Sequence, residues 1–211
     1  MENNKIGIAV SNSLISEELK NISEDIIEDT LDTFNYGTLK DIPIVNYVVD
    51  SIGVISSIRD KIFFKKLIYF LYNCKDIDFE KRVKFMEKNF KDDGKEFGEK
   101  IILIIDRLND INKSVLMANL FRALIYEDIQ QEQFFRLCNV ISNCYIEDLI
   151  YLKEKRNNSI SGIRAISLFN QGLVGITNFS EVNFEDDTQY EITSLGKILV
   201  DNAFSSTTDY Q

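Results

Sequence analysis

The chain has 211 residues, of which 45% are hydrophobic and 27% are charged, and its formal net charge is −10. This balance is typical of a soluble globular protein and excludes a disordered chain. The acid excess disfavours unselective nucleic-acid binding, because most of that affinity comes from neutralising phosphates. With one Pro and nine Gly, the chain favours long helices over an all-β fold. We therefore predict a mainly helical protein.

Histidine is absent from the chain, which excludes Ser-His and Cys-His nucleophile pairs as well as His-containing zinc sites. Glycine-rich phosphate loops and a nucleophile elbow have no signal in the sequence either. Cys74, Cys138 and Cys144 lie in apolar helical stretches, which indicates buried thiols in a reducing compartment. We expect a cytoplasmic protein that has no secretory signal, is not an enzyme and binds no metal or cofactor.

A first amphipathic helix is predicted from Ser11 to Tyr36. Its apolar stripe runs through Ile15, Leu19, Ile22 and Ile26. Ser16 provides a cap and Gly37 a stop. The opposite face carries the acids Glu24, Asp25, Glu28, Asp29 and Asp32. We interpret this face as solvated, and the alternative is a divalent cation shared by neighbouring carboxylates.

A second helix is predicted to begin near Pro43, whose missing amide costs nothing in a first turn. Its apolar stripe consists of Ile44, Val48, Ile52 and Ile55. The apolar run over residues 42–58 is shorter than the ~20 residues that a bilayer requires, and it carries Asp50. The sequence therefore predicts a helix of a globular domain here and not a membrane span.

The segment from Arg59 to Tyr72 interleaves aromatic residues with the cations Arg59, Lys61, Lys65 and Lys66. One interpretation is a core helix whose lysines extend outward to solvent. Another is a helix that lies on an anionic membrane surface, and a third is a groove for an acidic partner or a nucleic-acid backbone. We favour the core helix and keep the four cations as candidate partner-binding residues.

Three further helices complete a predicted N-terminal domain over residues 11–144. Asp76 or Asp78 is expected to cap a helix over residues 79–90. A long helix is predicted from Glu96 to about Tyr126. Asp128 followed by Gln131 matches a capping box, which predicts a helix that continues through Ile141.

A second module is predicted over residues 145–204. Its expected elements are a helix within residues 145–156, a helix over 160–171, strands over 172–177 and 188–193, and a last helix that Thr193 or Ser194 caps. The tip between the two strands is acidic. Residues 205–211 are short and polar, and we expect them to form a frayed tail.

The two segments "LFNQGLVGI" and "YEITSLGKILVDNAF" together resemble winged-helix domains. In that family a leucine-rich helix ends at a Gly-Leu pair, and a Thr-x-x-Gly turn leads from the second wing strand into a last helix. The residues that fit are Leu168, Gly172, Leu173, Val174, Tyr190, Ile192, Thr193, Leu195, Gly196 and Leu199. The resemblance implies DNA contacts by the helix before the hairpin and by the wing.

The charges of this module disagree with DNA binding. The helix before the hairpin offers base edges only Arg164, Asn170 and Gln171. The wing tip carries the carboxylates Glu181, Glu185, Asp186 and Asp187. These carboxylates would repel phosphates where a wing should attract them. We therefore predict that the module contacts protein, with Arg164, Glu185, Asp186 and Asp187 as candidate partner-binding residues.

The sequence thus predicts a non-enzymatic binding or adaptor protein of a bacterial cytoplasm that forms homodimers and contacts a further protein. Its richness in Ile, Asn and Lys is typical of proteins from AT-rich genomes. One alternative is a DNA-binding transcriptional regulator that acts through residues 160–197. The other is a membrane-surface effector that acts through the basic and aromatic residues of 59–72.

Overall fold

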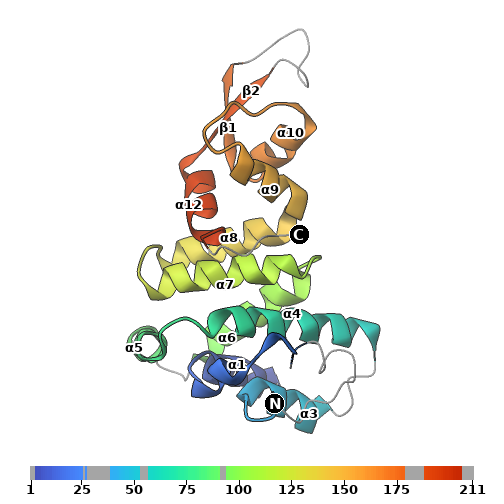
Figure 1. The fold of residues 1–211 in the computed structure, drawn as a ribbon, viewed down its shortest axis with the longest axis vertical. Coiled ribbons are helices and arrows are strands. Elements are labelled where there is room, and N and C mark those ends of the chain that lie inside the picture. Colours follow the sequence, from blue (N-terminus) through green and yellow to red (C-terminus); the bar gives the residue numbers. More distant parts are fainter. Residues whose placement is uncertain are drawn as a thin grey trace.

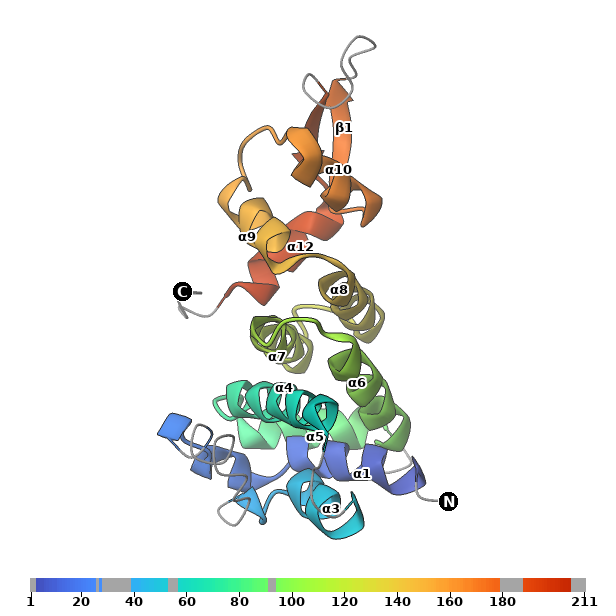
Figure 2. The same cartoon turned by 90° about the vertical axis from the view of Figure 1, so that its right-hand side faces the viewer.

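The structure is a computed structural model that describes residues 3–25, 27, 39–52, 57–90, 94–178 and 188–205. Within these residues the protein is mainly helical, with an antiparallel hairpin of two strands near the C-terminus. The molecule is elongated (Figure 1). Two helices, α7 (Asn112–Ile125) and α8 (Gln131–Asn143), cross its middle, with the earlier helices on one side and the hairpin on the other (Figure 2).

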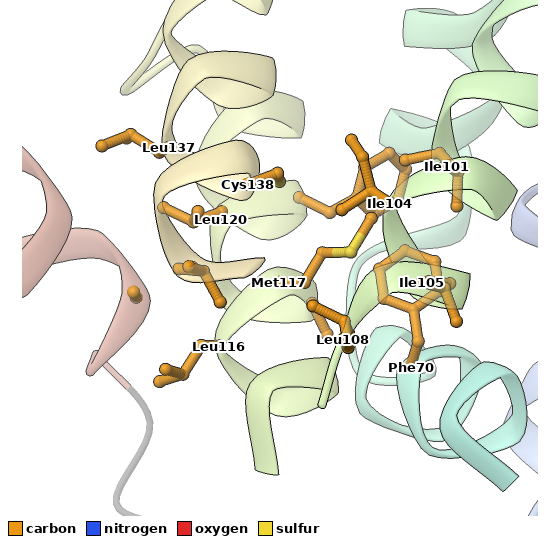
Figure 3. Packing of buried hydrophobic residues seen from close by; sticks show 14 of the residues in the cluster. Phe70, Ile101, Ile104, Ile105, Leu108, Leu116, Met117, Leu120, Leu137 and Cys138 are labelled. Atoms are coloured by element: carbon orange, nitrogen blue, oxygen red, sulfur yellow. The ribbon is translucent and has the colours of Figure 1, made fainter. Parts of the chain in front are cut away.

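Both halves of the molecule pack on α7. Twelve of its fourteen residues are buried, including the polar Lys113, Ser114 and Asn119, because neighbouring elements surround it. α4 (Ile58–Cys74), α8 and α12 (Ser194–Ala203) all contact it. Figure 3 shows Met117 directed toward Ile104 and Ile105 of α6 (Lys95–Arg107), while Leu116 points away from them. Asn119 donates a hydrogen bond of 2.8 Å to the carbonyl oxygen of Ala203, at the end of α12.

The N-terminal helix α1 (Asn3–Leu14) crosses α6 at very close range. A methyl group on Gly98 would lie 2.0 Å from the backbone oxygen of Gly7. Beside this crossing, the Ser11 hydroxyl donates a hydrogen bond of 2.7 Å to the carbonyl oxygen of Gly94. α3 (Pro43–Ile52) also packs against α1. The small residues therefore allow two backbones to touch.

The boundaries predicted for the first helix are wrong. α1 begins at Asn3 and ends at Leu14, and a 3-10 helix, η1 (Glu17–Asn21), follows it. Ser16 does form a cap, since its Oγ accepts a hydrogen bond of 3.1 Å from the Glu18 amide, but the helix that it caps is η1. At the point where the chain leaves α1, the Arg82 guanidinium donates a hydrogen bond to the carbonyl oxygen of Leu14. Residues 26 and 28–36 of the predicted helix lie outside the described residues.

The single helix predicted over residues 96–126 is divided into α6 and α7. Residues 108–111 separate them, and the Asp110 carboxylate accepts a hydrogen bond of 2.7 Å from the Asn112 amide. Such a local bond competes with helix continuation. The capping box predicted at Asp128 lies two residues later than expected, because Gln130 donates its amide to Gln133 Oε1 at 2.8 Å.

The remaining predicted elements are confirmed within the described residues, while Ile55 of the second predicted helix and residues 206–211 of the expected tail lie outside them. α3 begins at Pro43, and the Asp78 carboxylate accepts a hydrogen bond of 2.9 Å from the Lys81 amide at the start of α5 (Phe79–Asn89). Thr193 caps α12 through a bond of 3.1 Å from the Gly196 amide. The other observed elements are α9 (Ile146–Glu154), α10 (Gly162–Asn170), β1 (Val174–Asn178) and β2 (Gln189–Ile192).

The hairpin is extended by a third short segment of backbone. β1 pairs antiparallel with β2, and Ile176 lies opposite Tyr190. Ile160 forms an isolated bridge to Tyr190, with two backbone hydrogen bonds of 2.9 Å each. The link between α9 and α10 is thereby fixed to the far strand of the hairpin. The boundary predicted between residues 144 and 145 stays a prediction, and α12 packs on α7 across it.

Buried cations hold the C-terminal ends of several helices. The Lys66 ammonium donates to the carbonyl oxygens of Asp106 at 2.8 Å and Leu108 at 2.7 Å, at the end of α6. Arg82 of α5 donates to Leu14 at the end of α1. The last carbonyl groups of a helix have no partner within it, so these side chains supply the missing donors.

Lys113 of α7 does the same for α8. It is fully buried and donates to the carbonyl oxygens of Ser142, at 3.4 Å, and of Cys144. Burial lowers the pKa of Lys113, against the nearby Cys144, Asp110 and Glu147, which raise it. Burial likewise lowers the pKa of Lys66 below its ordinary value of 10.5. The charged form of each lysine is therefore less stable in the folded protein than it is in water.

The three cysteines are free and buried, as the sequence predicts. Burial raises the pKa of the Cys144 thiol to about 12, and it raises the pKa of Cys74 and Cys138 as well. Since the thiolate is the reactive form of cysteine, these residues serve as small apolar groups of the core.

Substituting Gly98 tests the close crossing of α1 and α6. Ala is favoured over Gly in a free helix by about 1 kcal/mol, but here its methyl would meet the Gly7 backbone. We expect Gly98→Ala to lower the free energy of unfolding in urea by about 1–3 kcal/mol. Gly175→Ala is the control, because its methyl would lie at an ordinary 3.7 Å from Thr193. Equal stability of the two variants would contradict the crossing.

Lys66 and Lys113 make stability depend on pH in the alkaline range. In the folded protein the pKa of each lysine lies below its ordinary value of 10.5, which the unfolded chain keeps. Between the lowered folded pKa and pH 10.5, the unfolded chain therefore binds more protons than the folded one. Stability contributed by each lysine therefore rises with pH in this window. We expect the wild type to gain stability relative to Lys66→Met or Lys113→Met as the pH rises toward 10.5, measured by urea unfolding. The raised pKa values of the buried thiols make stability fall with pH, but this effect is the same in wild type and variant and cancels in their difference. A difference in stability between wild type and variant that does not change with pH would contradict the lowered pKa of the substituted lysine.

Candidate functional site

The structure divides the four cations of the predicted basic and aromatic segment between surface and interior. Arg59 and Lys65 are exposed on α4, and Lys61 is half-buried. Arg59 forms an ion pair of 3.1 Å with Asp106. Lys66 is only 5% exposed and bonds the end of α6. Lys66 therefore serves the fold and is not presented to a partner.

The aromatic side of α4 faces inward. Phe64 and Phe70 are buried in the core, which agrees with the core interpretation of this helix. The exposed apolar residues of α4 are Ile58 and Ile62, at its first turns. Among the described residues, no helix is both long enough and apolar enough to cross a bilayer.

A different group of cations forms a pocket that the sequence analysis missed. This pocket, of about 380 Å³, lies between α5 and the C-terminal end of α7. We call it the lysine pocket, and it is lined by Lys81, Lys84, Phe85, Lys88, Ile125, Tyr126 and Glu127. The three lysines are spaced by three and four residues along α5, which places them on one face of the helix. That spacing was visible in the sequence, but the rest of the lining depends on tertiary packing.

The lysines already interact with the end of α7. Lys88 Nζ lies 2.9 Å from a carboxylate oxygen of Glu127. Lys81 Nζ lies 4.0 Å from the centroid of the Tyr126 ring, a cation–π distance. The hydrogen bond from Lys88 lowers the pKa of Glu127, and Lys84 lowers it further. Among the described residues, no carboxylate forms an ion pair with Lys84. Three cations therefore surround one anion.

Glu127 has an unusual backbone conformation for its residue type. Its φ is 63°, in the left-handed region that favours glycine. The Asp128 amide bonds the Ala123 carbonyl at 2.9 Å, and the Glu127 amide bonds the Leu124 carbonyl at 3.1 Å. This is the Schellman pattern of a helix end, where glycine is the usual residue. A glutamate here costs about 1–2 kcal/mol of backbone strain.

A larger hollow, of about 620 Å³, lies between α1 and α3. Its charged lining consists of Lys5, Lys40, Asp41 and Asp50. Two cations thus face two anions, and the hollow selects for neither sign of charge.

Arg164, the candidate residue of α10, is engaged within residues 145–204. Its Nε lies 3.9 Å from a carboxylate oxygen of Asp148. Its guanidinium carbon lies 5.4 Å from the centroid of the Tyr151 ring. Both partners belong to α9. The exposed apolar residues of α10 are Ile163, at 79%, and Phe169, at 41%. This helix therefore presents apolar surface and holds its cation against its neighbour.

The candidate acids of the wing tip and part of the predicted acidic face lie outside the described residues. Glu185, Asp186 and Asp187 lie outside the described residues, as does Glu181. In the described ranges, no group of three or more His, Cys, Asp or Glu side chains could hold a metal ion. Glu28, Asp29 and Asp32 of the predicted acidic face fall outside those ranges.

Two adjacent lysines of α4 test which cations belong to the fold. Lys66→Met removes the donor for two carbonyl oxygens at the end of α6. We expect it to lower the free energy of unfolding by about 1–3 kcal/mol, the cost of buried acceptors without a donor. Lys65→Met changes an exposed side chain and should alter stability by less than about 0.5 kcal/mol. Urea unfolding at neutral pH measures the stability of both variants. Similar losses of stability would contradict the assignment of Lys66 to the interior and Lys65 to the surface.

Searches of protein-family models, curated proteins and solved structures returned no match to this chain.

Proposed function

We propose that the protein is a non-enzymatic binding or adaptor protein of the cytoplasm whose residues 145–204 form a winged-helix-like module that docks another protein. The observation that carries this proposal is the exposed apolar face of α10, with Ile163 at 79% and Phe169 at 41% exposure. Exposed apolar residues on one helix face are characteristic of helices that bind in the groove of a partner.

The same face supports protein rather than DNA as the ligand. A helix that reads the major groove presents arginine, lysine or amide side chains to base edges. Here Arg164 is paired with Asp148 and lies against Tyr151. Using it to contact DNA would break both interactions. Residues 145–211 contain ten acids and five bases, so the approach of a phosphate backbone is also repelled.

The proposed partner is a protein that presents apolar side chains surrounded by lysine and arginine. Interfaces commonly place apolar residues at the centre and charged residues at the rim. On this chain the centre is Ile163 and Phe169 of α10, within a module whose residues 145–211 contain ten acids and five bases. A basic rim on the partner matches that acid excess and speeds association. The homodimer expected from the sequence is a separate property, which sedimentation measures on the isolated chain.

Ile163→Asp tests this surface. The substitution places a charge at the centre of the proposed interface but alters a side chain that is 79% exposed, so the fold should persist. A partner is first isolated from the native host and purified, and its affinity is then measured by calorimetry. We expect Ile163→Asp to weaken binding by about tenfold or more.

The matched control is Ile58→Asp, which alters an equally exposed isoleucine on α4, at 76%. Its affinity should equal that of the wild type. Equal binding by wild type and Ile163→Asp would refute the role of α10. Tight, sequence-selective retention of a DNA duplex in a gel shift at moderate salt would overturn the proposal in favour of a DNA-binding regulator.

A further inference from the structure

We propose that the lysine pocket is a binding site for a small phosphate monoester with an aromatic or apolar body, for which a nucleoside monophosphate is the probe. This site lies in the N-terminal helices, and it is independent of the proposed docking surface on α10. Its occupant is defined by the charge, size and lining of the pocket.

The charge of the pocket matches a phosphate monoester. Lys81, Lys84 and Lys88 face a single carboxylate, that of Glu127. The lining therefore carries two excess positive charges, while a phosphate monoester carries about −1.5 to −2 at neutral pH. Ammonium groups act as point charges that bind phosphate from several directions. The chain as a whole carries a net charge of −10 and repels anions. An anion is therefore attracted to this local excess of lysines and not to the protein surface in general.

The size and the apolar lining require a ligand with a body. The pocket of about 380 Å³ falls in the range of ~300–1,000 Å³ typical of sites for small organic ligands. A phosphate group alone would leave most of it empty. The rest of the lining is Phe85, Ile125 and the Tyr126 ring, which is the exposed member of the three. An aromatic base can pack against these groups while the phosphate contacts the lysines.

Glu127 acts as an internal competitor for the lysines. Its carboxylate is held 2.9 Å from Lys88, in the position of an anion, and its backbone occupies a conformation that favours glycine. Local strain of this kind is concentrated at ligand sites. A bound phosphate would take Lys88 from this carboxylate. Removing the carboxylate should therefore strengthen binding and relieve the strained helix end.

Calorimetry on the full chain tests the site with three probes. AMP carries both the phosphate and the aromatic body, inorganic phosphate carries only the first, and adenosine only the second. We expect saturable binding of AMP, with inorganic phosphate and adenosine each weaker by about tenfold or more. Absence of saturable AMP binding up to millimolar concentration would overturn the proposal, as would inorganic phosphate that binds as tightly as AMP.

Three variants locate the binding. Lys84→Gln removes an exposed cation of the pocket and should weaken AMP binding by roughly fivefold to tenfold. Glu127→Gly should tighten it by several-fold without loss of stability in urea. Lys65→Gln removes an exposed lysine of α4 outside the pocket and should change neither property. If Lys84→Gln and Lys65→Gln weaken AMP binding equally, the protein attracts AMP only through its overall charge and the pocket is not the site. If Glu127→Gly binds AMP more weakly than the wild type, the carboxylate does not compete with phosphate for the lysines.

Discussion

Several helices of this protein end against another helix, whose buried side chain donates to their last carbonyl groups. Each of these ends receives donors from a side chain of another helix. Arg82 of α5 serves the end of α1, Lys66 of α4 serves α6, and Lys113 of α7 serves α8. A carbonyl group left without a donor in such a place costs about 1–3 kcal/mol. These cations therefore decide where the chain can leave one helix and begin the next.

This use of cations also shapes the surface. Lys66, Arg82 and Lys113 are buried, so their charges do not offset the acids that face solvent. Among the described residues the only buried acid is Asp148, so the charges left facing solvent are more acidic on balance than the total of −10 suggests. Against that background the lysine pocket is a local exception, and the apolar face of α10 is a second surface of different character. The helices α5 and α10, which carry the lysines of the pocket and the exposed apolar residues, lie on opposite sides of α7 and α8 along the length of the molecule (Figure 1).

The sequence predicted most helices and the hairpin because their apolar spacing and caps are local signals. Pro43, Asp78 and Thr193 each mark a helix start at the expected place. The two errors in helix boundaries arose where apolar spacing continues across a break. The turn after α6 had a weak signal in Asp110, whose carboxylate bonds a nearby amide. At the end of α1 the Leu14 carbonyl bonds Arg82, which lies 68 residues away in the sequence, and a local pattern does not register such a partner.

The candidate sites were less predictable than the fold. Lys65 and Lys66 are neighbours in the sequence, yet one is exposed and the other buried, since only packing of α4 against α6 distinguishes them. The lysines of α5 were visible as a face of one helix, but their opposite wall comes from the end of α7. The left-handed conformation of Glu127 has no sequence signal, because glycine is the residue that usually marks it.

The contact between α1 and α6 sets a delay during synthesis. Ser11 and its partner Gly94 are separated by 83 residues. Ribosomes add ~5–20 residues per second, so roughly 4 to 17 s pass between the emergence of the two partners. During that time the apolar face of α1 has no α6 to cover it, and apolar surface exposed in this way favours aggregation until α6 has been made.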